Sequence, residues 1–390
     1  MPGWLVALFA AAFVFYTDDY VIAGILPELA DDLGVGEGQA GQLVTAFSLT
    51  VAVAAPVAAV VLARVPRRRL FAVALVVFVV ANAAAALAPP FAVLMVLRVV
   101  AALAAASATP ALFAYAAGHA PADKVGRYLA IISLGVTGSI AAGVPVGTWI
   151  GGALGWQATF AAVAIAGALV LLLVLRTLPG EDRLDEAPAL GEQLRTLRQP
   201  AISLGLLANC ALMTGSMMML TYLAPYLATT TTGGVDMRGL AFGLAGVAGI
   251  AGIWLGGLAT DRWGADRALL FGVGVIVAAM AGLWGLWGAR PAPLLLVLVV
   301  TTVWAAMAFW NSPAIQARLH ALAGPVAGQA LALNTSGTYL GVSIGAAIGG
   351  VLLSGVGVGG LPIAAAAFAI GALVLLALAR PVGRASTQPA

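Results

Sequence analysis

The sequence predicts an all-α polytopic membrane protein with twelve spanning helices. Its 390 residues are 62% hydrophobic and 8% charged, and the mean hydropathy is +1.06, whereas soluble domains are about 45–50% apolar and about 25% charged. The apolar runs are long enough to cross about 30 Å of hydrocarbon as helices, which takes about 20 residues each. Helices also satisfy their own backbone hydrogen bonds in lipid. Soluble enzymes and nucleic-acid-binding proteins are therefore excluded.

Twelve segments result when the chain is divided wherever charges, glycine and proline clusters or polar runs interrupt the apolar stretches. They comprise approximately residues 4–27, 41–63, 70–88, 92–118, 128–152, 158–177, 201–228, 240–259, 268–288, 293–317, 328–352 and 361–379. No positively charged region precedes the first segment, so we expect a retained helix rather than a cleaved secretory signal.

The positions of lysine and arginine predict how these spans are oriented. Twelve spans place both ends of the chain on one side, and cytoplasmic loops carry an excess of positive charge. With cytoplasmic termini, fifteen of the eighteen Lys and Arg residues lie inside, Arg238 and Arg290 lie outside, and Arg98 lies in the membrane. We therefore expect a multi-pass protein of the cytoplasmic membrane with both termini in the cytoplasm.

A polar interval at residues 178–200 divides the chain near its midpoint and carries five acids and three arginines. It predicts a cytoplasmic linker between two six-helix bundles, residues 1–177 and 201–380, with a cytoplasmic tail at 381–390. A row of glycines in the fifth span recurs 194 residues later in the eleventh: Gly143, Gly147, Gly151 and Gly155 match Gly337, Gly341, Gly345 and Gly349. Such rows form smooth helix faces for close packing, although a glycine-rich chain can also produce them by chance.

Three ionisable residues lie inside predicted spans: Asp18, Asp19 and Arg98. A charge in a span costs about 2.5–3.5 kcal/mol on insertion scales, so such residues are candidates for function. Asp19 lies about 12 Å from the outer end of its span and Arg98 about 10 Å, so their depths are similar. A carboxylate between apolar surroundings and an arginine can load and release a proton. The alternative is a structural ion pair that locks the first span to the fourth.

Four stretches of the chain resemble motifs of a known family of membrane proteins. Residues 17–30 (TDDYVIAGILPELA) resemble its first-span signature, and Leu97-Arg98 resembles its fourth-span motif. Residues 143–160, which begin GVPVG and end GWQATF, look like its fifth-span motif, and residues 256–267 (GGLATDRWGADR) are similar to its loop motif between spans eight and nine. The family that these stretches resemble is the twelve-spanning drug:proton antiporters of the major facilitator superfamily.

This resemblance covers essentially the whole chain and implies the major facilitator fold of two pseudo-symmetric six-helix halves. It gives Asp19, Asp18 and Arg98 a role in proton coupling. The fifth-span motif points to export, and the resemblance assigns conformational roles to Gly143, Pro145, Gly147, Gly257, Asp261 and Arg262. The first-half copy of the loop motif, residues 62–69, lacks the usual aspartate. Its basic cluster is expected to fix topology and to contact anionic lipid.

The first-span residues and the short linker are most similar to bacterial chloramphenicol-type, multidrug and sugar or nucleoside exporters. We therefore expect a proton-coupled drug exporter of the bacterial cytoplasmic membrane, of the kind that confers antibiotic resistance, acting as a monomer without cofactor or metal. The alternatives are an importer or uniporter of the same fold, or a non-transporting membrane sensor. An enzyme is not expected, because the G-x-S-x-G pattern at residues 341–345 lies inside an apolar helix.

In such folds the substrate site lies near the midplane between the halves. The candidates are polar, aromatic and methionine side chains at that depth, each of which could instead be a helix-packing contact: Tyr16, Asn82, Tyr115, Asn209, Met213, Met217, Tyr222, Trp304, Trp310, Asn311, Asn334 and Tyr339. Asn311 and Asn334 are the stronger candidates, because a lone amide in lipid needs a partner or water. Two acids and one arginine favour neutral or cationic solutes over anions.

Overall fold

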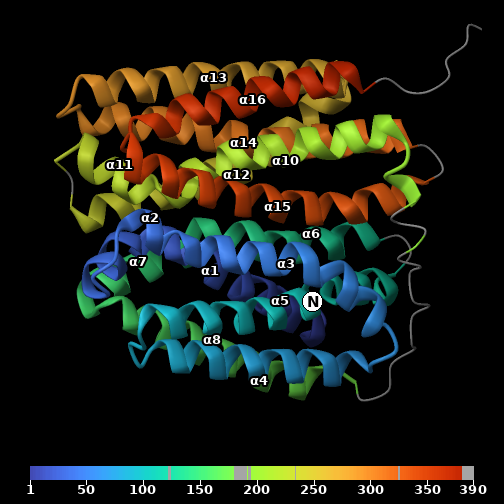
Figure 1. The fold of residues 1–390 in the computed structure, drawn as a ribbon. Helices are drawn as coiled ribbons and strands as arrows, with labels where there is room; N and C mark the ends of the chain where they lie inside the picture. Colours follow the sequence, from blue (N-terminus) through green and yellow to red (C-terminus); the bar gives the residue numbers. More distant parts are fainter. Residues whose placement is uncertain (122–123, 180–190, 192–194, 233, 324–325, 380–390) are drawn as a thin grey trace, which may run out of the picture.

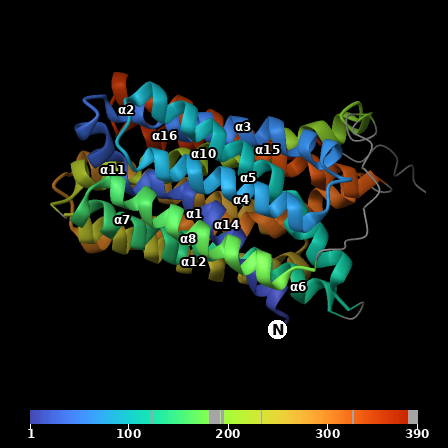
Figure 2. The same ribbon diagram turned by 90° about the horizontal axis from the view of Figure 1, so that it is seen from below.

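The computed structural model describes residues 1–121, 124–179, 191, 195–232, 234–323 and 326–379. Within these ranges every regular element is a helix, and twelve stretches are long and apolar enough to cross a membrane. Figures 1 and 2 show these stretches running side by side along one common direction. The prediction of an all-helical, twelve-span protein is confirmed. Most of the predicted linker at 178–200 and all of the predicted tail at 381–390 lie outside the described residues.

The helices form two groups that follow each other in the chain (Figure 1). The first group, the N-terminal bundle, contains α1 (Gly3–Asp32), α2 (Glu37–Ala40), α3 (Gln42–Val61), α4 (Arg67–Ala85), α5 (Phe91–His119), α6 (Val125–Gly138), the π-helical turn η1 (Ser139–Gly143), α7 (Val144–Leu154) and α8 (Trp156–Thr177). The second group, the C-terminal bundle, contains α10 (Pro200–Thr221), α11 (Leu223–Thr230), α12 (Val235–Trp263), α13 (Ala265–Gly288), α14 (Leu294–Ala323), α15 (Ala327–Gly355) and α16 (Gly360–Leu378).

Prolines explain where two predicted spans are interrupted. The fifth span consists of α6, η1 and α7, because Pro145 has no N–H for the carbonyl group of Ala141 and the helix widens into a π turn there. The seventh span breaks at Tyr222 for the same reason, since Pro225 leaves the Thr221 carbonyl group without its helical partner. Helix α1 instead continues through Pro27 to Asp32, so the first predicted span ended too early.

The two glycine rows let helices of the same bundle approach each other closely. Gly143 and Gly147 contact Thr17 and Val21 of α1. In the C-terminal bundle, the matching row on α15 contacts α10, and a Cβ atom on Gly345 would overlap the backbone of Thr214. The first and seventh spans occupy the same position relative to their glycine rows. The predicted smooth faces are therefore real packing surfaces that recur in both bundles, except that Gly155 lies beyond the end of α7 with φ +89° and does not belong to the helical row.

The bundles meet mainly where α2 and α3 lie against α15, where η1 and α7 lie against α12, and where α1 lies against α10 and α11. We call the end of the molecule where α4 begins and α16 ends the terminal end, on the right in Figure 1, and the other the opposite end. At the opposite end Gly38 lies against Gly350, and Gly41 lies against the hydroxyl group of Tyr222. Nearer the middle, Ser343 donates a hydrogen bond to the carbonyl oxygen of Thr45 at 3.3 Å. The opposite end is therefore closed by direct contact between the bundles.

Exchange of Gly345 for alanine should lower the melting temperature of the purified protein. The added methyl group meets backbone rather than a flexible side chain, and overpacking of this kind costs about 1–3 kcal/mol. The control is Gly285→Ala in α13, where a Cβ atom meets nothing within 4 Å and alanine improves helix propensity by up to about 1 kcal/mol. Equal melting temperatures for the two variants would contradict the close approach of α15 and α10.

Candidate functional site

A fully buried ion pair joins α1 to α5 inside the N-terminal bundle. Arg98 Nη1 lies 2.8 Å from Asp18 Oδ1, and Arg98 Nη2 donates a hydrogen bond of 3.0 Å to the backbone oxygen of the same aspartate. The guanidinium group also lies over the ring of Phe47, 4.4 Å from its centroid. Asn82 of α4 interacts with the Asp18 carboxylate from another side. The arginine is therefore held by partners from α1 and α3, and its direct partner is Asp18 rather than Asp19.

Asp19 points in a different direction, because neighbouring residues on a helix lie about 100° apart. Its carboxylate is buried, and no described residue donates a hydrogen bond of ordinary geometry to either oxygen. It lies within electrostatic reach of Arg98 and Asp18 and interacts with Tyr339 of α15, in the other bundle. The ring of Tyr339 lies 6.5 Å from that of Tyr16. Asp19 is therefore a buried acid at the contact between the two bundles.

Of the predicted substrate residues, the structure brings Tyr16 and Tyr339 together beside Asp19, and places Asn82 beside Asp18. Others are satisfied within their own bundle. Asn209 Nδ2 donates to Thr338 Oγ1 at 3.0 Å, and Trp310 Nε1 donates to the Ala268 carbonyl at 3.0 Å. Tyr222 bonds to the Ala346 carbonyl group at 2.7 Å, and Tyr115 stacks on His119 with ring centroids 3.8 Å apart.

The remaining candidates lie in the C-terminal bundle. Asn311 Nδ2 donates to the Met307 carbonyl group at 2.9 Å, but Asn311 Oδ1, Asn334 Oδ1 and Trp304 Nε1 are buried without a hydrogen bond from the described residues. Met213 lies beside Gly341 on α15, and Met217 belongs to the apolar core. Among the predicted substrate residues, these three atoms can therefore bond to a ligand or to water. Two of them belong to Asn311 and Asn334, the stronger candidates from the sequence.

A second ion pair between the bundles was not foreseen from the sequence. Arg238 of α12 forms a two-pronged interaction with Glu28 of α1: Nη1 donates to Oε2 at 3.1 Å, and Nη2 pairs with Oε1. Glu37 of α2 lies within electrostatic reach of Arg238. The pair lies at the opposite end and ties the bundles together there. The available signal was an arginine on the side of the membrane that is poor in positive charge.

In the loop motif between α12 and α13, the residues that the sequence assigns conformational roles are Gly257, Asp261 and Arg262. Asp261 and Arg262 are exposed, and a Cβ atom on Gly257 would meet nothing within 4 Å. The described ion pair of this region is formed instead by Asp266 and Arg318, whose Nε lies 3.1 Å from Oδ1. Arg318 also donates to the Ala379 carbonyl group at 3.0 Å. This contact fastens α13 to α14 and α16 within one bundle.

Comparison with known proteins finds similarity over most of the chain. A family model described as "Major Facilitator Superfamily" matches residues 8–325. The "Uncharacterized MFS-type transporter YbcL" of Bacillus subtilis (strain 168) is 30% identical over 355 residues, covering 90% of each chain. A "Chloramphenicol resistance protein" of Streptomyces lividans is 32% identical over 265 residues, covering 67% of this chain and 68% of the relative. The crystal structure of a D-xylose-proton symporter has the same fold, with a TM-score of 0.76, 17% identity and 96% coverage of both chains.

Breaking the buried ion pair should destabilise the fold strongly. Asp18→Asn or Arg98→Gln removes one partner of a buried pair, which typically costs about 3–5 kcal/mol, whereas the double variant removes both partners together. The stability lost in the double variant should therefore be smaller than the sum of the two single losses. The control is Asp266→Asn, which removes an acid that is 71% exposed; its effect should stay below about 1 kcal/mol. Strictly additive losses would contradict a direct Asp18–Arg98 interaction.

Loss of the Glu28–Arg238 pair should weaken closure of the opposite end. Spin labels at Gly36→Cys and Val356→Cys, both exposed at that end, would report the separation by electron paramagnetic resonance, with the buried Cys210 changed to serine. Glu28→Gln should raise the ratio of open to closed molecules about fivefold, as expected for loss of about 1 kcal/mol.

The matched control for that measurement is Asp32→Asn on the same helix. Asp32 Oδ2 accepts hydrogen bonds from Trp156 Nε1 at 2.7 Å and Gln157 Nε2 at 2.9 Å, and both partners belong to the N-terminal bundle. Its loss should leave the distance distribution unchanged. If both variants open the molecule equally, the ion pair between the bundles has no special role.

Proposed function

The chain belongs to the major facilitator superfamily, and from this premise we propose that it is a proton-coupled exporter of small organic molecules. Proteins of this fold are transporters that work by alternating access, in which two bundles rock about a central site. The family and the structural neighbours are transporters rather than enzymes. Beyond the transporter class, we propose which ion is coupled, in which direction transport runs and which class of substrate is carried.

The position of Asp19 is the observation that carries proton coupling. A buried carboxylate without a hydrogen-bond donor is unstable as an anion unless a cation, a proton or a ligand approaches it. Arg98 is already occupied by Asp18 and by the ring of Phe47. Asp19 is therefore the acid with spare bonding capacity, while Asp18 and Arg98 form the fixed pair beside it.

Asp19 can connect protonation to movement because it faces the other bundle. When the carboxylate is ionised, the hydroxyl group of Tyr339 can donate a hydrogen bond to it across the contact between the bundles. When Asp19 is protonated, its charge is lost and it can become a donor itself, so the balance of contacts between α1 and α15 changes. The two protonation states then favour different arrangements of the bundles, which is what coupled transport requires.

Three observations support export of a neutral or cationic compound. The chain is 32% identical to a chloramphenicol resistance protein over 265 residues, and its fifth span contains the motif that resembles that of antiporters. Asp18, Asp19 and Arg98 together carry a net charge of −1 when both acids are ionised, which disfavours anions. A proton and a substrate that bonds to Asp19 would compete for the same carboxylate, and this competition is the simplest basis for exchange in opposite directions.

Export driven by the proton gradient also depends on which end of the protein faces the cytoplasm. We assign the terminal end to that side. The exposed arginines Arg64, Arg69, Arg262 and Arg267 lie in or within a few residues of the α3–α4 and α12–α13 connections at that end, in agreement with the excess of positive charge in cytoplasmic loops. The closed opposite end then faces outward. In this arrangement the protein is a multi-pass protein of the bacterial cytoplasmic membrane whose substrate enters from inside the cell.

An importer or uniporter of the same fold is the second candidate. It would use the Asp18–Arg98 pair as a structural lock and would need no proton at Asp19. Among the described residues Asp19 contacts Tyr339 but forms no ion pair, and this favours the exporter, because a purely structural acid is normally paired when it is buried.

The test uses purified protein in liposomes that contain a pH-sensitive dye, with chloramphenicol and cationic and neutral compounds as substrates. Wild type should move protons when a substrate is added, and Asp19→Asn should reduce this movement to the level of empty liposomes. Asp31→Asn, an exposed acid on the same helix, should retain it. Both variants should remain monodisperse, and Asp31→Asn should also bind substrate as wild type does.

Proton movement that persists in Asp19→Asn would contradict the role of that residue. Binding and transport of substrate by wild type without any proton movement would identify a uniporter and overturn the coupling.

A further inference from the structure

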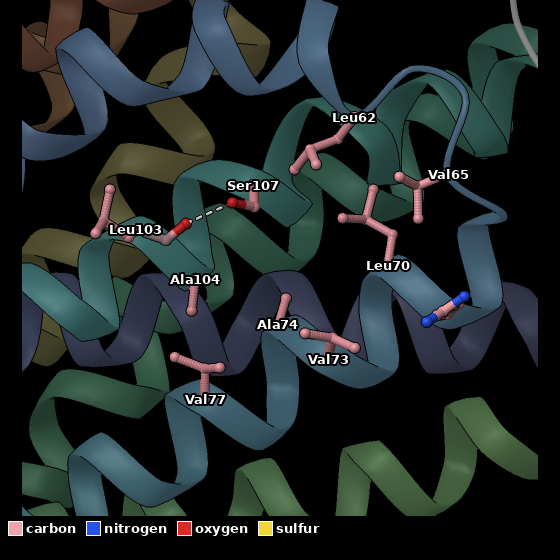
Figure 3. A pocket seen from close by; sticks show the side chains of 10 residues that line it. Leu62, Val65, Leu70, Val73, Ala74, Val77, Leu103, Ala104 and Ser107 are labelled. Atoms are coloured by element: carbon pink, nitrogen blue, oxygen red, sulfur yellow. Dashed lines mark hydrogen bonds between the residues drawn. The ribbon is translucent and has the colours of Figure 1, made fainter.

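A groove of about 300 Å³ opens on the surface of the N-terminal bundle near the terminal end (Figure 3). It lies between α4 and α5 and is bounded by the loop that joins α3 to α4. Its walls are apolar and are formed mainly by Leu70, Val73, Val77, Leu103 and Ala104. Ser107 also lines it, but the hydroxyl group already donates to the Leu103 carbonyl group at 2.7 Å. The groove therefore suits a hydrocarbon chain rather than a polar solute.

The groove faces the surroundings of the protein rather than the contact between the bundles. Val73 is 56% exposed and Leu103 is 46% exposed, and both belong to helices that span the membrane. Along α4 the groove extends from Arg69 to Val77, which is about 12 Å at 1.5 Å per residue. Its occupant is therefore a molecule of the bilayer that lies along the helix with one end near the membrane surface.

Positive charge marks the surface end of the groove. Arg69 is one of the residues that line it, and Arg64 lies in the adjoining loop; both are exposed. The other two arginines of this loop region are held by the protein. Arg67 is buried, and Arg68 Nη2 donates to the Leu175 carbonyl group at 2.6 Å. Arg64 and Arg69 are thus the two exposed arginines beside the groove.

The connection between α12 and α13 in the C-terminal bundle corresponds to the α3–α4 loop but differs from it in charge. There, Arg262 and Arg267 stand beside Asp261 and Asp266, so the loop carries its own anions. Residues 62–69 contain four arginines and no acid. A phosphate group at this position would supply the negative charge that the N-terminal loop lacks, and arginine binds phosphate with paired hydrogen bonds.

We propose that this groove is a binding site for an anionic phospholipid of the leaflet at the terminal end. One acyl chain lies between α4 and α5 along Val73 and Val77, and the headgroup phosphate lies between Arg64 and Arg69. A zwitterionic lipid is a poorer occupant, because its ammonium group would meet the same cluster of arginines. The site does not depend on the direction of transport or on Asp19.

The test is a titration of the purified protein in detergent with phosphatidylglycerol, with bound lipids counted by native mass spectrometry. Wild type should bind one phosphatidylglycerol more tightly than the rest and should show no such preference for phosphatidylcholine. In the Arg64→Gln/Arg69→Gln variant the affinity of this first site should fall about 30-fold, since each arginine near a membrane surface contributes about fivefold.

Two further variants separate the groove from general charge effects. Ser107→Leu keeps every arginine but fills the groove, and it should weaken the first site about tenfold by displacing acyl methylene groups. Arg262→Gln/Arg267→Gln removes the same charge from the other bundle and should leave the first site unchanged. Inorganic phosphate should not displace the lipid.

Three results would overturn the proposal. Equal binding of phosphatidylcholine and phosphatidylglycerol would show that the arginines do not select the headgroup. An equal loss in the Arg262→Gln/Arg267→Gln control would show that only total charge matters. Full displacement by inorganic phosphate would identify a site for the free anion rather than for a lipid.

Discussion

The ion pair between Arg98 and Asp18 determines how the N-terminal bundle is arranged around its centre. An arginine in a membrane span requires a partner inside the protein, because lipid offers none. The backbone oxygen and carboxylate of Asp18 and the ring of Phe47 meet this requirement together. These contacts fix the rotation of α1 about its axis. Fixing α1 in turn directs the next residue, Asp19, towards α15 of the other bundle.

The contacts between the bundles combine one kind of interaction that is insensitive to ionisation and two that depend on charge. Glycine contacts such as Gly38 against Gly350 bring backbones together through shape alone. The Glu28–Arg238 pair and the surroundings of Asp19 are electrostatic. Rocking of the bundles must separate the glycine contacts and the ion pair at the opposite end, and it changes the surroundings of Asp19 near the middle of α1. The energy difference between the two arrangements can therefore be adjusted by charge while the packing surfaces stay the same.

The sequence was sufficient for features that depend on length, composition and local pattern, including the twelve spans, the glycine rows and the buried Asp18, Asp19 and Arg98. It could not decide which aspartate contacts Arg98, because neighbours on a helix differ only in direction and tertiary packing sets the rotation. The Glu28–Arg238 contact joins residues 210 positions apart and requires the relative placement of two bundles. Hydropathy likewise could not show that Trp310 bonds to a neighbouring backbone.

The separation of Asp18 and Arg98 in the chain also has a consequence for biogenesis. The two residues are 80 positions apart, and synthesis proceeds at about 5–20 residues per second. Asp18 is therefore synthesised about 4–16 s before its cationic partner. During this interval its carboxylate cannot draw on the contact that stabilises the finished protein. The cost of placing Asp18 in the membrane is therefore met before its ion pair with Arg98 can form.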